Sequence, residues 1–201
     1  MSAIHPLPDR LKGPGELLLR SWKPQDAERL AAAIGESADH LRPWMAFMPH
    51  EPLPIEQRRA MIEEWERNRS DGGDAIYGVF LGDRVAGGCG LHHRLADGLE
   101  IGYWIHVDFT GQGLATRAST LLTDAAFAHP GIERVQIRHD RANLRSGRVP
   151  RKLGFTLVQE TRDGVEAPGE VGISCRWQIT REAWLARDPE RGRATPPQTP
   201  D

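Results

Sequence analysis

A glycine-rich turn joins a strand to a helix at residues 108–119, DFTGQGLATRAS, and no other segment constrains the fold as tightly. The preceding residues 99–107 have the character of a strand, and residues 114–131 carry apolar side chains at helical spacing. Residues 134–140 form a second strand-like run. A strand, a helix and a strand in this order predict a right-handed crossover between two parallel strands.

Further strands and helices are predicted on both sides of this unit. Before it we expect a strand at 16–22, helices at 23–37 and 54–73, and two strands at 75–83 and 84–94 that meet at a Gly-Asp hairpin signal. After it we expect a helix at 143–154, strands at 155–161 and 173–180, and a last helix that starts near Arg181. This order predicts an α/β fold, mixed α+β in type, around a central sheet.

One domain accounts for most of the chain, because 201 residues suit a single core. Residues 1–14 are rich in Pro and Gly and are expected to form a flexible arm. Residues 188–201 are charged and Pro-rich and are expected to be a disordered tail. The predicted domain is residues 15–187.

Charge and composition exclude several classes of function. The formal net charge is −2, so no basic field exists to hold nucleic acid. No apolar run is long enough for a membrane span, and the first residues lack the apolar core of a signal peptide, so a cytoplasmic protein is expected. Cys89 and Cys175 lie in strand-like runs and are expected to be reduced and buried. No metal is expected, because no cluster has ligand spacing.

The glycine turn has the features of an anion site. A strand that feeds a helix through such a turn leaves N–H groups free at the helix N-terminus, where the helix dipole favours negative charge. Gly111 and Gly113 remove the Cβ atoms that would block a phosphate. No Gly-Lys-Ser/Thr follows and the third glycine of the dinucleotide pattern is missing. Taken alone, the turn is also explained as a plain strand-to-helix connection.

Several further motifs stand around this turn in a fixed order: LLLR at 17–20, HLRPW at 40–44, EIGYW at 100–104, the pair Asn143 and Ser146, and KLGF at 152–155. Together they resemble the GNAT superfamily of acyl-CoA-dependent N-acyltransferases, in the RimJ/RimL branch that acetylates N-terminal residues of ribosomal proteins. The resemblance spans about residues 16–184. It implies the GNAT fold, a central, mostly antiparallel sheet with a splayed parallel pair and flanking helices.

The resemblance also implies acetyl-CoA (coenzyme A) as co-substrate and a place for each part of it. The backbone amides of the turn hold the pyrophosphate, and the strand Ile105–Val107 splays from its neighbour near Arg138 and pairs with the pantetheine arm. Asn143 binds the pantetheine region, and Ser146 protonates the departing thiolate or else bonds its own helix backbone. The implied cofactor-binding residues are Ile105, His106, Val107, Gly111, Gln112, Gly113, Leu114, Ala115, Thr116, Asn143 and Ser146.

Two residues depart from expectation near this site. Thr110 stands where the superfamily pattern prefers Arg or Gln, so a side-chain contact to the phosphates is in doubt. Pro150 lies inside the short helix, where it removes one donor and opposes the carbonyl of Ser146. That carbonyl is then free for a ligand, or the helix is only kinked.

Glu100 is the leading candidate for the base that takes the amine proton, because some superfamily members use a glutamate at the matching place. The alternative is a surface glutamate that pairs with Arg94 across a hairpin. His92 and His93 are adjacent on a strand and point to opposite faces, so at most one faces the cleft. His92 ranks below Glu100 as a candidate base and is kept as a substrate-binding candidate.

The acceptor site is expected under residues 40–51, HLRPWMAFMPHE, which roof it in the family that the chain resembles. Trp44, Phe47 and Met48 would form an apolar wall, and Glu51 would attract a cationic amine. The alternative is that these residues cap the core.

Three functions remain open from the sequence. The first is an N-acetyltransferase that acts on a primary amine, with a protein N-terminal α-amine as the favoured acceptor. The second acts on a small amine such as an antibiotic, a polyamine or an amino acid. The third is a non-catalytic acyl-CoA-binding regulatory module. Donors such as succinyl-CoA stay open, a homodimer is compatible with the sequence, and neither nucleic acid nor a membrane is expected as a partner.

Overall fold

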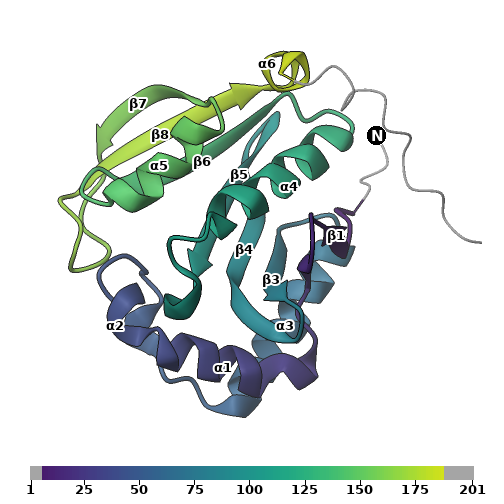
Figure 1. Ribbon diagram of the computed structural model, residues 1–201, viewed down its shortest axis with the longest axis vertical. Coiled ribbons are helices and arrows are strands. Elements are labelled where there is room, and N and C mark those ends of the chain that lie inside the picture. Colours follow the sequence, from purple (N-terminus) through teal and green to yellow (C-terminus); the bar gives the residue numbers. More distant parts are fainter. Residues whose placement is uncertain (1–5, 188–201) are drawn as a thin grey trace, which may run out of the picture.

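An eight-stranded sheet forms the centre of the molecule in the computed structural model, which describes residues 6–187 (Figure 1). The strand order is β1-β2-β3-β4-β5-β6-β8-β7. The strands are β1 (Arg10–Lys12), β2 (Leu17–Ser21), β3 (Ala75–Leu81), β4 (Arg84–Leu95), β5 (Gly98–Ile105), β6 (Arg134–Asp140), β7 (Thr156–Arg162) and β8 (Ile173–Thr180). In the described part of the chain β5 and β6 are parallel and every other pair is antiparallel.

Within residues 6–187, six α-helices accompany the sheet: α1 (Ala27–Glu36), α2 (Ala38–Leu41), α3 (Ile55–Ser70), α4 (Leu114–Ala128), α5 (Leu144–Lys152) and α6 (Arg181–Ala186). Alternate residues of β3 face different layers, as the pleat requires. Tyr77 and Val79 pack into the core under α4, whereas Phe80 packs with residues of α1 and α3. Helices α4 and α5 therefore cover one face of the sheet, and α1 and α3 cover the other (Figure 1).

The parallel pair diverges part-way along its length. Strands β5 and β6 pair from Gly98 and Arg134 as far as Ile101 and Ile137. Beyond this point β5 continues beside β4 to Ile105, while β6 continues beside β8. The divergence confirms the predicted splayed pair and leaves the last residues of β5 with an unpaired backbone edge on one side.

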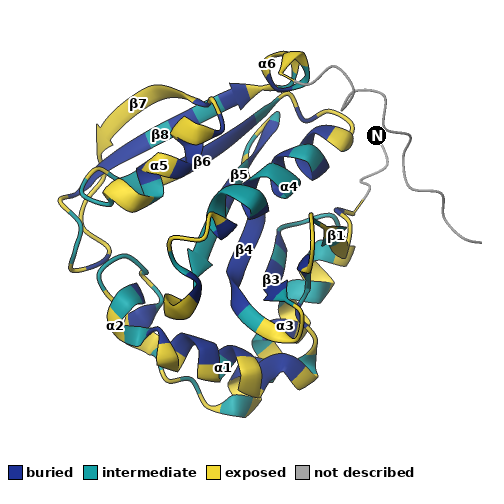
Figure 2. Cartoon of the chain, in the orientation of Figure 1, coloured by how far each residue is buried: buried dark blue, intermediate teal, exposed yellow. Residues whose placement is uncertain are grey.

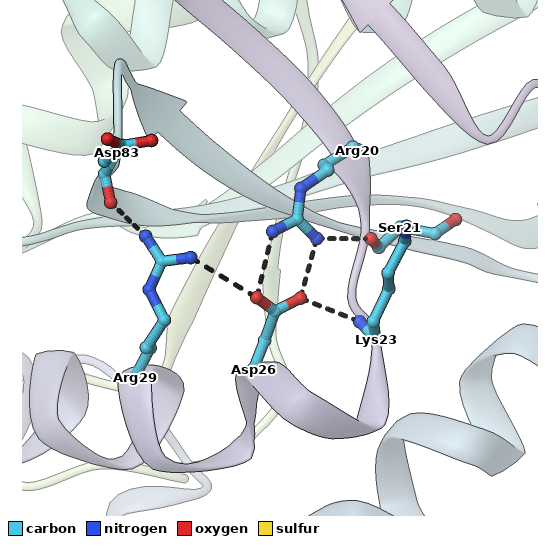
Figure 3. A network of polar contacts seen from close by, with 6 residues as sticks. All are labelled: Arg20, Ser21, Lys23, Asp26, Arg29 and Asp83. Atoms are coloured by element: carbon cyan, nitrogen blue, oxygen red, sulfur yellow. Dashed lines mark hydrogen bonds and ion pairs between the residues drawn. The ribbon is translucent and has the colours of Figure 1, made fainter.

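The LLLR segment is fixed to the start of α1 by an ion pair that Figure 3 shows. Arg20 binds Asp26 through two nitrogens, at 2.6 and 2.9 Å, and the backbone N–H of Lys23 donates to the same carboxylate at 2.9 Å (Figure 3). Burial raises the pKa of Asp26, but these hydrogen bonds outweigh it and hold the pKa below its usual value. This motif therefore has a structural function, because it fixes the start of α1 against β2.

The predicted strands and the longer helices are confirmed, with differences at the edges. Part of the predicted flexible arm is ordered, because Arg10–Lys12 pair with β2 as β1, Leu7 is buried, and Tyr77 donates to the carbonyl of Pro8 at 2.7 Å. Helix α2 was not predicted. The first five residues and the predicted tail at 188–201 lie outside the described residues. Strand β7 is exposed along its whole length, whereas β4 is buried at its centre (Figure 2).

Both cysteines are free and buried, as predicted. Within residues 6–187, no helix is long and apolar enough to cross a membrane. No group of three or more His, Cys, Asp or Glu in that range could hold a metal ion.

Candidate active site

A cleft of about 440 Å³ lies where β5 and β6 separate. Its walls are the end of β5, the glycine turn, α5, and the segment around Trp44. The predicted residues that line it are Trp44, Ile105, Gly111, Gly113, Leu114, Ala115, Thr116, Asn143 and Ser146. Two hollows of about 560 Å³ lie elsewhere, one between β2 and α3 and one across β5, β6 and β8. We place the site in the smaller cleft, because it contains the glycine turn and the unpaired edge of β5.

The glycine turn is an open cradle. Gly111 and Gly113 have φ angles of 78° and 74°, and Gly113 is the N-cap of α4. A Cβ at either position would meet no atom within 4 Å, so the space in front of the backbone is empty of protein. Left-handed residues beside a helix start turn successive N–H groups toward one point, which is the arrangement that binds anions. The backbone of this turn fits a phosphate group.

Side chains of the turn brace its backbone. The hydroxyl of Thr110 donates to the carbonyl of Val107 at 3.0 Å, and the amide nitrogen of Gln112 donates to the carbonyl of Asp108 at 3.1 Å. Thr110 therefore does not replace the Arg or Gln of the family pattern, and the Gln112 side chain closes the turn.

Basic side chains enter the cleft from the opposite wall. Arg145, Arg148 and Lys152 stand on α5 at intervals of three and four residues, so they share one helix face, and all three line the cleft. His40 lines it as well, and its pKa is lowered by burial and by the charges of Arg145 and His106. Sequence reasoning missed these groups, although the spacing of the three cations was visible in the sequence.

Two predicted cofactor-binding residues, His106 and Val107, do not line the cleft. Strand β5 ends at Ile105, and Val107–Phe109 form a 3-10 turn, η3. His106 is 3% exposed, and its ring Nε2 lies 2.9 Å from Glu36 Oε2. Its backbone N–H donates to the carbonyl of Ala86. The N–H of Val107 donates to Ser37 Oγ at 3.1 Å. The backbone N–H groups of both residues, and the His106 ring, are already hydrogen-bonded to the segments of α1 and β4. The unpaired edge available to a ligand therefore ends at Ile105.

Ser146 and Asn143 stand together at the start of α5. Asn143 is the N-cap, and its Oδ1 accepts from the N–H of Ser146 at 3.1 Å. The Oγ of Ser146 lies 3.0 Å from the hydroxyl of Tyr103, which also donates to the carbonyl of Ser146 at 3.0 Å. Tyr103 lines the cleft and was not predicted as a site residue.

Glu100 does not line this cleft. Its side chain lies in the larger hollow across β5 and β6, where its Oε1 is 3.6 Å from Nε of Arg94. The contact with Arg94 is the alternative that the sequence left open. Glu100 and Ser146, the two predicted catalytic residues, lie on different faces of the sheet, because Ser146 contacts Tyr103, three residues along β5 from Glu100.

His92 is the register partner of Glu100 and lies on the same face. Its Nδ1 is 2.8 Å from Oδ2 of Asp74, and Oδ1 of Asp74 accepts the N–H of His93 at 2.8 Å. The carboxylate can only accept, so Nδ1 carries a proton, and in the neutral ring the lone pair is on Nε2.

The predicted acceptor wall is only partly correct. Trp44 lines the cleft, together with Met45 rather than Met48, which is buried in the core between α1 and α3. Phe47 packs, half-buried, against the same core. The carboxylate of Glu51 is paired with Arg58, which is 2% exposed, and also accepts the N–H of Leu53 at 3.1 Å. Glu51 is therefore neutralised and does not attract an amine.

The model of the acetyltransferase (GNAT) domain matches residues 16–156, more than half of the chain. The chain belongs to the GNAT acetyltransferase family. The matched range runs from just before β2 to the start of β7, and so contains the splayed strands, the glycine turn and α5. It is an N-acetyltransferase, as the sequence motifs predicted.

Individual relatives agree with this GNAT assignment. A protein of Bacillus subtilis (strain 168) named "Putative ribosomal N-acetyltransferase YdaF" is 31% identical over 170 residues, which cover 84% of this chain and 93% of the relative. A crystal structure described as "Probable acetyltransferase" is 29% identical with a TM-score of 0.81, and covers 87% of this chain and 98% of its own. A structure of RimL, a ribosomal L7/L12 α-N-protein acetyltransferase in complex with coenzyme A, is 19% identical with a TM-score of 0.79. The match covers 87% of this chain and 99% of the RimL chain.

Proposed function

We propose that this GNAT protein transfers an acetyl group from acetyl-CoA to a primary amine, and that its acceptor is the α-amine of a protein N-terminus. The observation that carries the proposal is the cleft between β5 and β6, which has an open glycine cradle at one end and the Ser146 hydroxyl on its wall. The names of the relatives support it, since RimL is described as bound to coenzyme A and YdaF is named for ribosomal substrates.

The donor would lie along β5. Its pyrophosphate would sit on the N–H groups of Gly111 to Ala115, with the cations of α5 facing it across the cleft. Its pantetheine arm would add to the unpaired edge of β5 between Gly102 and Ile105, as an extended peptide adds to a sheet. The thioester would then reach the point where β5 and β6 separate.

Proton transfer completes the reaction. The amine nitrogen attacks the thioester carbon, the C–S bond breaks, and the thiolate takes a proton from the hydroxyl of Ser146. Tyr103 holds Ser146 in position, because its hydroxyl donates to the backbone carbonyl of Ser146 at 3.0 Å and its oxygen lies 3.0 Å from the serine Oγ. A base must take the amine proton, and the candidates are Glu100 and His92, which are register partners on the other face of the sheet.

The neutralised Glu51 favours a protein acceptor over a small cationic amine. A small amine suits a closed, acidic pocket, and the acidic residue predicted for that role is paired with Arg58. A protein N-terminus requires an open approach, and the polar face of β6 and β8 carries a hollow of about 560 Å³.

Two measurements test this function. Acetyl-CoA should raise the unfolding temperature of the protein, whereas ATP and NAD should not. No shift with acetyl-CoA would remove the donor assignment. A screen that reads free thiol release should then be run with peptides of varied first residue and with a panel of small amines. Turnover of peptides supports the protein acceptor, and turnover of small amines alone rejects it.

A further inference from the structure

His92 is held in one orientation by Asp74, which directly precedes β3. Nδ1 of His92 donates to Oδ2 of Asp74 at 2.8 Å, and the other carboxylate oxygen accepts the N–H of His93. Burial raises the pKa of Asp74, but these hydrogen bonds outweigh it and keep the pKa below its usual value, so the carboxylate is ionised at neutral pH. In the neutral ring of His92, Nε2 is therefore the hydrogen-bond acceptor, and no hydrogen bond from the described residues occupies it.

Two glycines make room for this ring. Gly90 of β4 and Gly102 of β5 are register partners. A Cβ added at Gly90 would lie 3.0 Å from Nε2 of His92, and one added at Gly102 would lie 3.3 Å from the same atom. Nε2 therefore lies directly over the paired glycines, and any side chain at either position would displace the imidazole. This is a physical reason for glycine within the EIGYW segment of this chain.

Gly102 is also where the unpaired edge of β5 begins. Ile101 is the last residue of β5 that pairs with β6, so Gly102 is the first with an unpaired edge. A pantetheine arm that runs from the glycine cradle along this edge ends beside Gly102. The acyl group would then lie between two faces, with Ser146 on the side of α5 and Nε2 of His92 on the side of α1 and α3.

We propose that His92 is the base of the reaction and that Asp74 is its positioning residue. Nε2 takes the proton from the amine nitrogen as the N–C bond forms, the C–S bond breaks, and the thiolate takes the proton of Ser146. Solvent returns the proton from His92 to Ser146, so the enzyme is unchanged. This proposal rests on the proposed function above.

Glu100 suits this step less well. Its carboxylate is 3.6 Å from Arg94 and lies in the separate hollow across β5, β6 and β8, whereas Nε2 of His92 lies over Gly102, the first residue of the unpaired edge. The charged groups around His92 are Asp74 from the start of β3, Glu100 across the strand pair, Arg94 beside Glu100, and His93 on the far side of Asp74.

The experiment compares variants in acetyl transfer to whichever peptide or amine the wild-type protein turns over in the screen. His92→Gln should lower kcat by roughly a hundredfold or more, with the KM for acetyl-CoA unchanged, because general base catalysis contributes about 10²- to 10⁴-fold. Asp74→Asn should lower kcat less and move the acidic limb of the pH profile. His93→Gln is the matched control, since its backbone bond to Asp74 is retained, and it should stay within about twofold of wild type. Wild-type kcat in His92→Gln overturns the proposal.

The outcomes separate this proposal from the proposed function. A wild-type protein that releases no thiol with any acceptor contradicts the proposed function itself. Long-range proton–nitrogen NMR of the histidine rings needs no acceptor. It should show His92 as the Nδ1–H tautomer, and its Nε2 signal should shift when acetyl-CoA is added. An Nε2–H tautomer, or a signal that acetyl-CoA leaves unchanged, overturns the role of His92 whatever the acceptor is.

Discussion

The hydroxyl of Tyr103 donates a hydrogen bond of 3.0 Å to the backbone carbonyl of Ser146, and so joins β5 to α5 across the cleft. In a regular helix that carbonyl would accept from the N–H of residue 150, but Pro150 has none. The proline therefore frees a carbonyl for a side chain of the neighbouring strand. Burial raises the pKa of Tyr103 to about 12, although the bond with Ser146 acts against it, so the hydroxyl stays a donor at neutral pH.

Tyr103→Phe should destabilise the protein by about 1–3 kcal/mol, because the carbonyl of Ser146 is left without a partner. Pro150→Ala restores the helical N–H. The cost of Tyr103→Phe should therefore be smaller by about 1 kcal/mol in the Pro150→Ala background, which a double-mutant cycle by urea unfolding measures. Strictly additive free energies of unfolding would contradict the link between proline and tyrosine.

Gly113→Glu should abolish the thermal shift caused by acetyl-CoA, because it puts bulk and negative charge into the cradle. Gly131→Glu is the matched control. Gly131 also has a positive φ, of 82°, and open space around it, but it lies beyond the far end of α4. Both variants carry the same kind of backbone strain, so only the position differs. A normal shift in Gly113→Glu would show that the turn does not bind the donor.

The cations of α5 should supply the phosphate contacts that Thr110 does not. Arg148→Glu and Lys152→Glu should each weaken acetyl-CoA binding by roughly three- to tenfold, since one exposed charge pair contributes about 1 kcal/mol. The loss should shrink at high salt, where such charges are screened. Arg162→Glu, exposed on β7, is the control and should bind as wild type does. Calorimetric titration at two salt concentrations measures all three, and equal affinities would reject the role of α5.

Local patterns predicted the elements and the cradle, because helical spacing, strand character and paired glycines depend on neighbouring residues alone. The roles of single side chains depended on distant partners. Glu51 is neutralised by Arg58, and the His106 ring is hydrogen-bonded to Glu36, which is 70 residues away in the sequence. No local pattern shows whether Glu100 turns toward Arg94 or toward the cleft. The role proposed for His92 depends on Asp74, which is 18 residues away in the sequence and directly precedes another strand, β3.

Stability should depend on pH through His139, which belongs to β6 and packs against Gly147 of α5. Its Nδ1 donates to the carbonyl of Asp140 at 2.7 Å, and its Nε2 accepts from the indole N–H of Trp177 at 3.0 Å. An indole N–H can only donate, so a second proton on the ring would face it and break this bond. Burial is the main cause of the lowered pKa of His139, and it outweighs the bond and the charge of Asp140, which act to raise the pKa.

A pKa lower in the folded protein than the unfolded value of 6.5 means that the unfolded chain binds the proton more readily. The free energy of unfolding should therefore be at its full value above pH 6.5 and should fall as the pH drops below it, toward the folded pKa. His40 acts in the same direction, because its pKa is also lowered. His139→Gln removes one titrating group, so urea unfolding between pH 7.5 and 5 should show a shallower loss of stability for this variant than for wild type. Parallel curves for the two proteins would mean that His139 titrates alike in the folded and unfolded states.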